Sequence, residues 1–140
     1  MIYRYDVKEK ASRALSGPGY LEPSYSPDGK YLAATRQSTL GTDVVILDGQ
    51  TGSELMRVTN DGRSWGPKWS PAGDAIAFLN INGQSADLHL AKLAGEPGAW
   101  SVEDVVSLTD VSGLDAASKP DWYIPKDDLP AATASPSSAP

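Results

Sequence analysis

The stretch "YSPDGKYLAATR" (residues 25–36) returns in altered form 44 residues later as "WSPAGDAIAFLN" (residues 69–80). Each copy begins with an aromatic residue and Ser-Pro, passes through a glycine-containing turn and continues into an apolar run. Proline presets φ for the first central position of a turn and glycine accepts the positive φ that follows, so each copy predicts a β-hairpin. A period of this length is typical of a supersecondary unit that buries its faces by stacking on copies of itself.

Strand-forming segments between the turn signals group into two rounds of four. The first round comprises residues 23–26, 31–36, 43–48 and 54–59, and the second comprises 66–70, 74–80, 86–93 and 104–109. Before them, "IYRYD" (residues 2–6) aligns with "VVILD" (residues 44–48), and a short strand is expected at residues 13–15. After them, "KPDWYIP" (residues 119–125) opens a third round. The chain is therefore expected to start inside one unit and to end inside another.

Two sets of positions recur in all three rounds: a proline and, two residues later, a large aromatic residue. They are Pro23, Pro67 and Pro120, followed by Tyr25, Trp69 and Trp122. The second strand of each full round is apolar on both faces, as expected for a sheet covered on both sides by neighbouring sheets. Four antiparallel strands per unit predict propeller blades, with the aromatic residue filling the same gap between blades each time. The predicted fold is all-β, a β-propeller segment of about two and a half four-stranded antiparallel blades.

These elements resemble a known family. "PSYSPDGKYLAATR…TDVVILDGQTGSELMRVT" and "PKWSPAGDAIAFLN…ADLHLAKL…VVSLT" are similar to the WD40-like β-propeller repeat of TolB-like proteins. The resemblance covers residues 1–125, and the second copy departs from it with Ala72 and Asp74 around its turn glycine. It implies either a protein-binding platform or a substrate-gating propeller beside a peptidase. It also implies an extracytoplasmic location, although the first ten residues contain no apolar segment of an export signal.

The resulting organisation has a partial blade at residues 1–20, blades at 21–60 and 61–110, and the start of a further blade at 111–125. The Pro/Ala/Ser-rich residues 126–140 are expected to be a disordered tail. Because propellers need about 4–8 blades, one copy cannot close a ring. We favour the C-terminal part of a larger ring, completed by upstream blades; self-association of copies is the alternative.

Composition excludes several classes of function. The net charge of −6 without a Lys/Arg cluster argues against nucleic acid and anionic membrane surfaces. The absence of cysteine removes disulfides, thiolate nucleophiles and cysteine-based zinc sites. No run approaches the roughly 18 apolar residues of a membrane-spanning helix, so no membrane insertion is expected.

One catalytic motif is matched literally, and we reject it. "GRSWG" (residues 62–66) fits the G-x-S-x-G nucleophile elbow, which would make Ser64 the nucleophile and His89 its base. That motif requires a strand before it and a helix after it, whereas here it lies between two expected strands. His89 has no second histidine or cysteine partner for zinc, and residues 80–87 lack calcium-loop spacing. We therefore expect no enzyme activity, no metal and no cofactor.

The remaining candidate site is a surface. Loops between blades and loops between second and third strands lie on one face of a propeller, which we call the loop face. Its candidate binding residues are Tyr20, Arg36, Gln37, Arg63, Trp65 and Asn80. Trp65 is not part of the repeat, and exposed Trp and Arg often dominate interfaces. The first hypothesis is a non-catalytic platform for a protein or peptide; the second is the regulatory propeller of a larger serine peptidase or hydrolase.

Overall fold

The computed structural model describes residues 1–110 and 113–128, which form three antiparallel sheets and one short 3-10 helix, η1 (Lys126–Asp128). The first sheet pairs β1 (Tyr3–Asp6) with β2 (Ala11–Ala14). The second has the order β3 (Tyr20–Tyr25), β4 (Tyr31–Ser38), β5 (Gly41–Asp48) and β6 (Glu54–Arg57). The third has the order β7 (Ser64–Trp69), β8 (Ala75–Asn82), β9 (Ser85–Ala94) and β10 (Ser101–Ser107).

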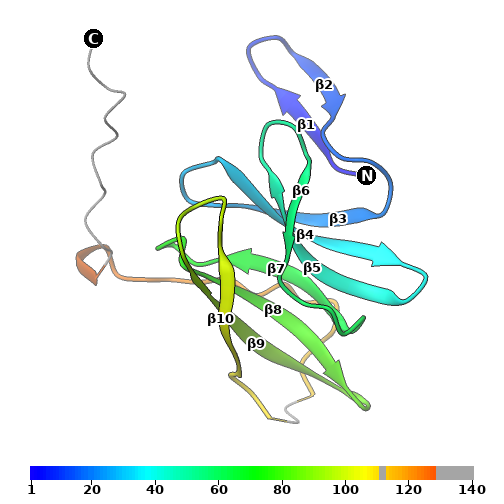
Figure 1. Ribbon diagram of the computed structural model, residues 1–140, viewed down its shortest axis with the longest axis vertical. Helices are drawn as coiled ribbons and strands as arrows, with labels where there is room; N and C mark the ends of the chain where they lie inside the picture. Colours follow the sequence, from blue (N-terminus) through cyan, green and yellow to red (C-terminus); the bar gives the residue numbers. More distant parts are fainter. Residues whose placement is uncertain (111–112, 129–140) are drawn as a thin grey trace.

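Strands that follow one another in sequence are neighbours in each sheet, and the two four-stranded sheets lie against each other (Figure 1). This is the arrangement of consecutive propeller blades. The prediction of an all-β propeller segment is confirmed. No helix in the described part of the chain has the length and apolar character needed to cross a membrane.

The two inner hairpins use the same hydroxyl with a different carboxylate. In the first, Ser26 Oγ donates to Asp28 Oδ1 at 2.7 Å and accepts from the Tyr31 N–H at 3.0 Å. In the second, where alanine replaces that aspartate, Ser70 Oγ donates to Asp74 Oδ1 at 2.9 Å. The departure of the second copy from the repeat therefore moves the carboxylate by two positions and keeps the hairpin.

A threonine closes each four-stranded sheet at its outer end. Thr59 Oγ1 accepts from the Val44 N–H at 2.9 Å and donates to Asp43 Oδ1 at 3.1 Å. Thr109 Oγ1 donates to Asp87 Oδ1 at 2.8 Å. The recurring aspartate and threonine of the sequence thus fix the chain as it leaves one sheet for the next.

The two-stranded sheet corresponds to the outer half of such a unit. Ser16 Oγ accepts from the Ile2 N–H at 2.9 Å, as Thr59 does in the next sheet. Asp6 Oδ1 accepts two backbone N–H bonds in the turn after β1, and Asp48 Oδ1 does the same after β5. The predicted alignment of residues 2–6 with residues 44–48 agrees with both contacts.

Trp69 lies at the centre of the core between the second and third sheets. It is 3% exposed, and its ring centroid is 5.4 Å from that of Trp100. Its indole Nε1 is buried with no hydrogen-bond partner in the described part of the chain. The residues of the second sheet that share this cluster include Ala33, Val44, Ile46 and Val58. The neighbouring residues Leu32, Ala34, Val45 and Leu47 pack with Ile2 and Leu15, which flank the first sheet, so β4 and β5 are buried on both faces.

Tyr25, the equivalent of Trp69 one round earlier, is 47% exposed. The expectation that all three aromatic residues fill a gap between blades is therefore wrong for Tyr25. The physical reason is that the first sheet contains only β1 and β2. It has no counterpart of β4 to form the platform on which such a ring packs.

Trp122 occupies the equivalent place one round later, although its segment is not a strand. It lines a hollow of about 300 Å³ with Ala77, Leu88, Leu90 and Leu108, the counterparts of the four residues beside Trp69. Residues 119–125 form no strand, contrary to the prediction, and no strand in the described part of the chain pairs with them. Within the expected disordered tail, residues 126–128 form η1, and residues 129–140 lie outside the described residues.

A residue with an unusual backbone conformation, Glu22 of β3, forms a hydrogen bond to the next inner strand, β7. Glu22 has a φ of 52°, and Gly66, its counterpart in the next round, has a φ of 62°. Left-handed backbone is unfavourable for a residue with a side chain. Glu22 Oε2 accepts from the Gly66 N–H at 3.0 Å and from Thr35 Oγ1 at 2.6 Å, which compensates for this strain. The glutamate thus links consecutive sheets.

Truncation of Trp69 tests the assignment of the core. Trp69→Ala is expected to lower the free energy of unfolding by about 3–5 kcal/mol, because it leaves a large cavity between two sheets. Tyr25→Ala, at the equivalent position but exposed, should cost less than about 1 kcal/mol. Urea unfolding followed by tryptophan fluorescence and circular dichroism measures both. Equal losses from the two variants would contradict the assignment.

Asp48 gives the stability a defined dependence on pH. The backbone N–H groups of Thr51 and Gln50 hold the pKa of its carboxyl below the usual 3.8. A carboxyl group whose pKa is lower in the folded than in the unfolded state stabilises the fold at pH values above the unfolded-state pKa. This contribution is lost as the pH falls through the folded-state pKa. Asp48→Asn keeps a hydrogen-bond acceptor without the charge. The difference in melting temperature from the unsubstituted chain should be larger at about pH 7 than at about pH 3; a constant difference would contradict the expected linkage.

Candidate functional site

The candidate residues of the loop face come from equivalent positions in successive sheets. Tyr20 pairs with Arg36 in the β3–β4 ladder, and Ser64 pairs with Asn80 in the β7–β8 ladder. Each pair is offset from the other by 44 residues. Different side chains thus stand at matching places of the repeat, and each pair is connected to a different carboxylate.

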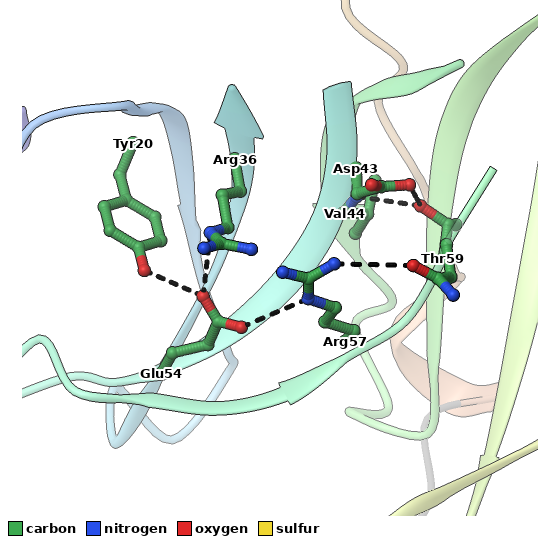
Figure 2. A network of polar contacts seen from close by, with 8 residues as sticks. Tyr20, Arg36, Asp43, Val44, Glu54, Arg57 and Thr59 are labelled. Atoms are coloured by element: carbon green, nitrogen blue, oxygen red, sulfur yellow. Dashed lines mark hydrogen bonds and ion pairs between the residues drawn. The ribbon is translucent and has the colours of Figure 1, made fainter. Parts of the chain in front are cut away.

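In the second sheet that carboxylate belongs to Glu54 (Figure 2). The Tyr20 hydroxyl donates to Glu54 Oε2 at 2.7 Å, and Arg36 Nε lies 3.3 Å from the same oxygen. Arg57 Nε lies 3.5 Å from Glu54 Oε1, and its Nη1 donates to Asn60 Oδ1 at 3.4 Å. The network runs from the inner strand β3 to the outer strand β6, and it holds both guanidinium groups in place.

This environment changes the acidity of Tyr20. Burial of the phenol raises its pKa above the ordinary 10.0, and the hydrogen bond and negative charge of Glu54 raise it further. The positive charge of Arg36 opposes this effect. Tyr20 is therefore a neutral hydrogen-bond donor to Glu54 at physiological pH.

In the third sheet the carboxylate is that of Asp61, in the connection between β6 and β7. It accepts from Ser64 Oγ at 3.0 Å, from Asn80 Nδ2 at 2.6 Å and from the Arg63 N–H at 2.9 Å. Ser64 is fully buried. Three donors fix the orientation of the carboxylate beside the loop face.

The same contacts argue against Ser64 as a nucleophile. It lies at the start of β7, where no helix follows, so the strand–turn–helix context of the elbow is absent. Its hydroxyl donates to an aspartate, whereas the His89 ring packs against Phe78 with centroids 5.7 Å apart. The serine has the role of a structural hydrogen-bond donor.

Two hollows flank the Asn60–Asp61 connection. The larger, of about 540 Å³, is lined by residues of this connection and of the third sheet: Val58, Thr59, Asn60, Asp61, Phe78, Asn80, His89, Val105 and Ser107. The smaller, of about 360 Å³, is lined by Arg36, Ser38, Thr39, Leu40, Asp43, Arg57, Asn60, Asp61 and Gly62. Arg36 and Asn80 therefore line separate hollows that share two residues.

The other predicted residues are placed differently. The Gln37 side chain is exposed, and its N–H donates to the Gly19 carbonyl at 2.7 Å. The Arg63 side chain is also exposed. Trp65 is half-buried, and its Nε1 donates to the Ala116 carbonyl at 3.0 Å, so the C-terminal segment reaches it. The binding role of these residues stays a prediction.

Sequence reasoning missed the residues that organise the site, namely Glu54, Arg57, Asn60 and Asp61. Asn60 and Asp61 lie in a loop between blades, where polar residues could have been singled out. Glu54 and Arg57 lie in an outer strand, β6, and nothing in their spacing marks them. Their role depends on side chains that cross several strands.

The chain has two consecutive four-stranded blades, each closed by a threonine, with a tryptophan packed between them. These features define a β-propeller segment. Two curated relatives are the Tol-Pal system proteins TolB of Francisella tularensis subsp. tularensis and subsp. holarctica. Each is 33% identical over 78 residues, which is 54% of this chain and 18% of the relative. The chain thus spans less than a fifth of the length of these relatives, and no family model matches it.

Solved structures show the same architecture. A TolB candidate from Agrobacterium tumefaciens superposes with a TM-score of 0.62 at 20% identity, over 76% of this chain and 40% of the other. TolB from Acinetobacter baumannii gives a TM-score of 0.58 at 23% identity, over 71% of this chain and 25% of the other. The chain therefore has a β-propeller fold like that of the TolB structures, as the resemblance in sequence predicted.

Replacement of Glu54 tests the network in the second sheet. Glu54→Gln removes the negative charge beside the phenol, so the pKa of Tyr20 should move down toward its ordinary value. Titration of ¹³C-labelled tyrosine by NMR resolves this residue from the other five tyrosines. Glu9→Gln, in an exposed turn, is the matched control and should leave the pKa unchanged. An unaltered Tyr20 titration in Glu54→Gln would show that the contact does not form in solution.

Proposed function

We propose that this chain is a non-catalytic propeller segment that binds a protein or peptide partner through its loop face. The observation that carries the proposal is the contrast between repeated and non-repeated positions. The hairpin serines and closing threonines keep one chemistry in both full blades. The loop-face positions carry ordered networks that differ from blade to blade. Since the fold forms with either network, these side chains are available for specific recognition.

The composition of the loop face supports the same role. Arg63 and Gln37 are exposed, and Leu40, at the tip of the β4–β5 hairpin, is 88% exposed. Arginine and apolar side chains beside shallow hollows are typical of protein interfaces. The relatives are Tol-Pal system proteins, which is consistent with assembly with other proteins.

Two further parts of the proposal follow from the resemblance to TolB. The chain acts outside the cytoplasm, and its ring is completed either by upstream blades or by another copy. The relatives and structural neighbours described above are TolB proteins, which favours the binding platform over the peptidase-linked propeller.

Site-specific photo-crosslinking tests the platform. The photoreactive residue p-benzoylphenylalanine replaces Arg63 on the loop face or, as control, Gln50 in the turn at the opposite end of the strands. In an extract of the source cells, the Arg63 variant should form discrete protein adducts that excess unmodified chain suppresses. Adducts of the same pattern from both variants, or none from Arg63, would contradict a partner-binding loop face.

A further inference from the structure

The larger hollow is a groove between the second and third sheets with an apolar floor. Phe78 is 1% exposed and Val58 is buried, whereas Val105 of β10 is 45% exposed. Val105 thus offers apolar surface to a ligand, beside two buried apolar side chains. Aliphatic groups that cover it would bury apolar area from water.

The polar rim of this groove carries one carboxylate, that of Asp61. Asp61 is the acidic residue in the lining, which contains no lysine or arginine. Asp61 takes part in no ion pair among the described residues; its three donors are a hydroxyl, an amide and a backbone N–H. Asn80 uses its amide nitrogen for Asp61 and Ser64. The groove therefore presents a carboxylate that is held in place by hydrogen bonds and forms no ion pair with any described residue.

The repeat shows that the fold does not require this groove. The counterparts of Phe78 and His89 in the preceding sheet are the smaller residues Ala34 and Val45. The preceding connection between sheets is "GPG" (residues 17–19), which contains no acidic residue. Both the aromatic floor and the carboxylate are particular to the junction of the second and third sheets.

We propose that this groove receives a basic side chain with an aliphatic stem, flanked by apolar residues, from a protein partner. The stem packs on Phe78 and Val105, as the stems of long basic side chains do on apolar surfaces. The charged end reaches the Asp61 carboxylate, where a charge-assisted hydrogen bond replaces water. The net charge of −6 favours the approach of such a segment.

This inference rests on the proposed function, since it names the chemistry of the partner. The test uses the 140-residue chain, ¹⁵N-labelled, and two blocked tripeptides as probes. Acetyl-Leu-Lys-Leu-amide carries the cation, and acetyl-Leu-norleucine-Leu-amide is its uncharged counterpart. Amide shifts of Asp61 and Val105 and the side-chain amide shifts of Asn80 report binding in the groove. The lysine peptide should bind at least about tenfold more tightly than the norleucine peptide.

Two variants and one control complete the experiment. Asp61→Asn keeps hydrogen-bond capacity without charge and should weaken the lysine peptide by about tenfold. Val105→Lys, at an exposed position, places a competing ammonium in the groove and should abolish its binding. Glu9→Gln, an acidic residue in the remote β1–β2 turn, should change nothing. The amide spectrum of each variant verifies its fold.

Three results would overturn the proposal: equal affinity for both peptides, an Asp61→Asn variant that behaves like Glu9→Gln, or shifts that fall outside the groove. The crosslinking experiment tests the partner-binding role of the loop face independently of the peptides. Crosslinks from Arg63 together with a failed peptide test would leave the loop face as an interface and refute only the basic ligand. Peptide binding without crosslinks would refute the platform instead.

Discussion

Burial of Trp69 between two sheets is the interaction on which the rest of the structure depends. A single four-stranded sheet with apolar side chains on both faces cannot shield them from water, so each sheet needs a neighbour. The indole and the side chains around it join the second sheet to the third and cover one face of β4 and β5, whose other face packs on Ile2 and Leu15. The loop face exists because this stacking brings the β4–β5 hairpin beside the connection between β6 and β7, where the Thr42 N–H donates to the Gly62 carbonyl at 3.1 Å.

The internal repeat allows each contact in one full blade to be compared with the equivalent contact in the other. Where two blades keep the same contact, as at Thr59 and Thr109, the contact serves the fold. Where equivalent positions carry different, fully formed networks, as at Tyr20 and Ser64, the fold is satisfied by either. The difference is then free to be used for recognition. This argument needs only one chain, because each blade serves as the reference for the next.

The sequence predicted the strands of both full blades and the hairpin turns, because each depends on residues close together or repeated at a fixed spacing. It failed at Tyr25 and at residues 119–125, because burial and strand pairing there depend on which neighbours are present. It also missed Glu54 and Asp61, whose partners lie on other strands at distances set by sheet twist and register. The left-handed Glu22 was likewise unforeseen, since nothing local favours it and its compensation comes from the next sheet.

The indole nitrogen of Trp69 has no hydrogen-bond partner among the described residues, and this has a consequence for how such chains diverge in evolution. Because the ring is used for its volume and not for its polar group, exchange between large aromatic residues at this position breaks no hydrogen bond elsewhere. The repeat carries tryptophan at this position in Trp69 and Trp122, and tyrosine in Tyr25, which is 47% exposed. Duplicated blades can therefore drift apart in sequence one at a time, each acquiring its own surface chemistry, while the stack that holds them stays intact.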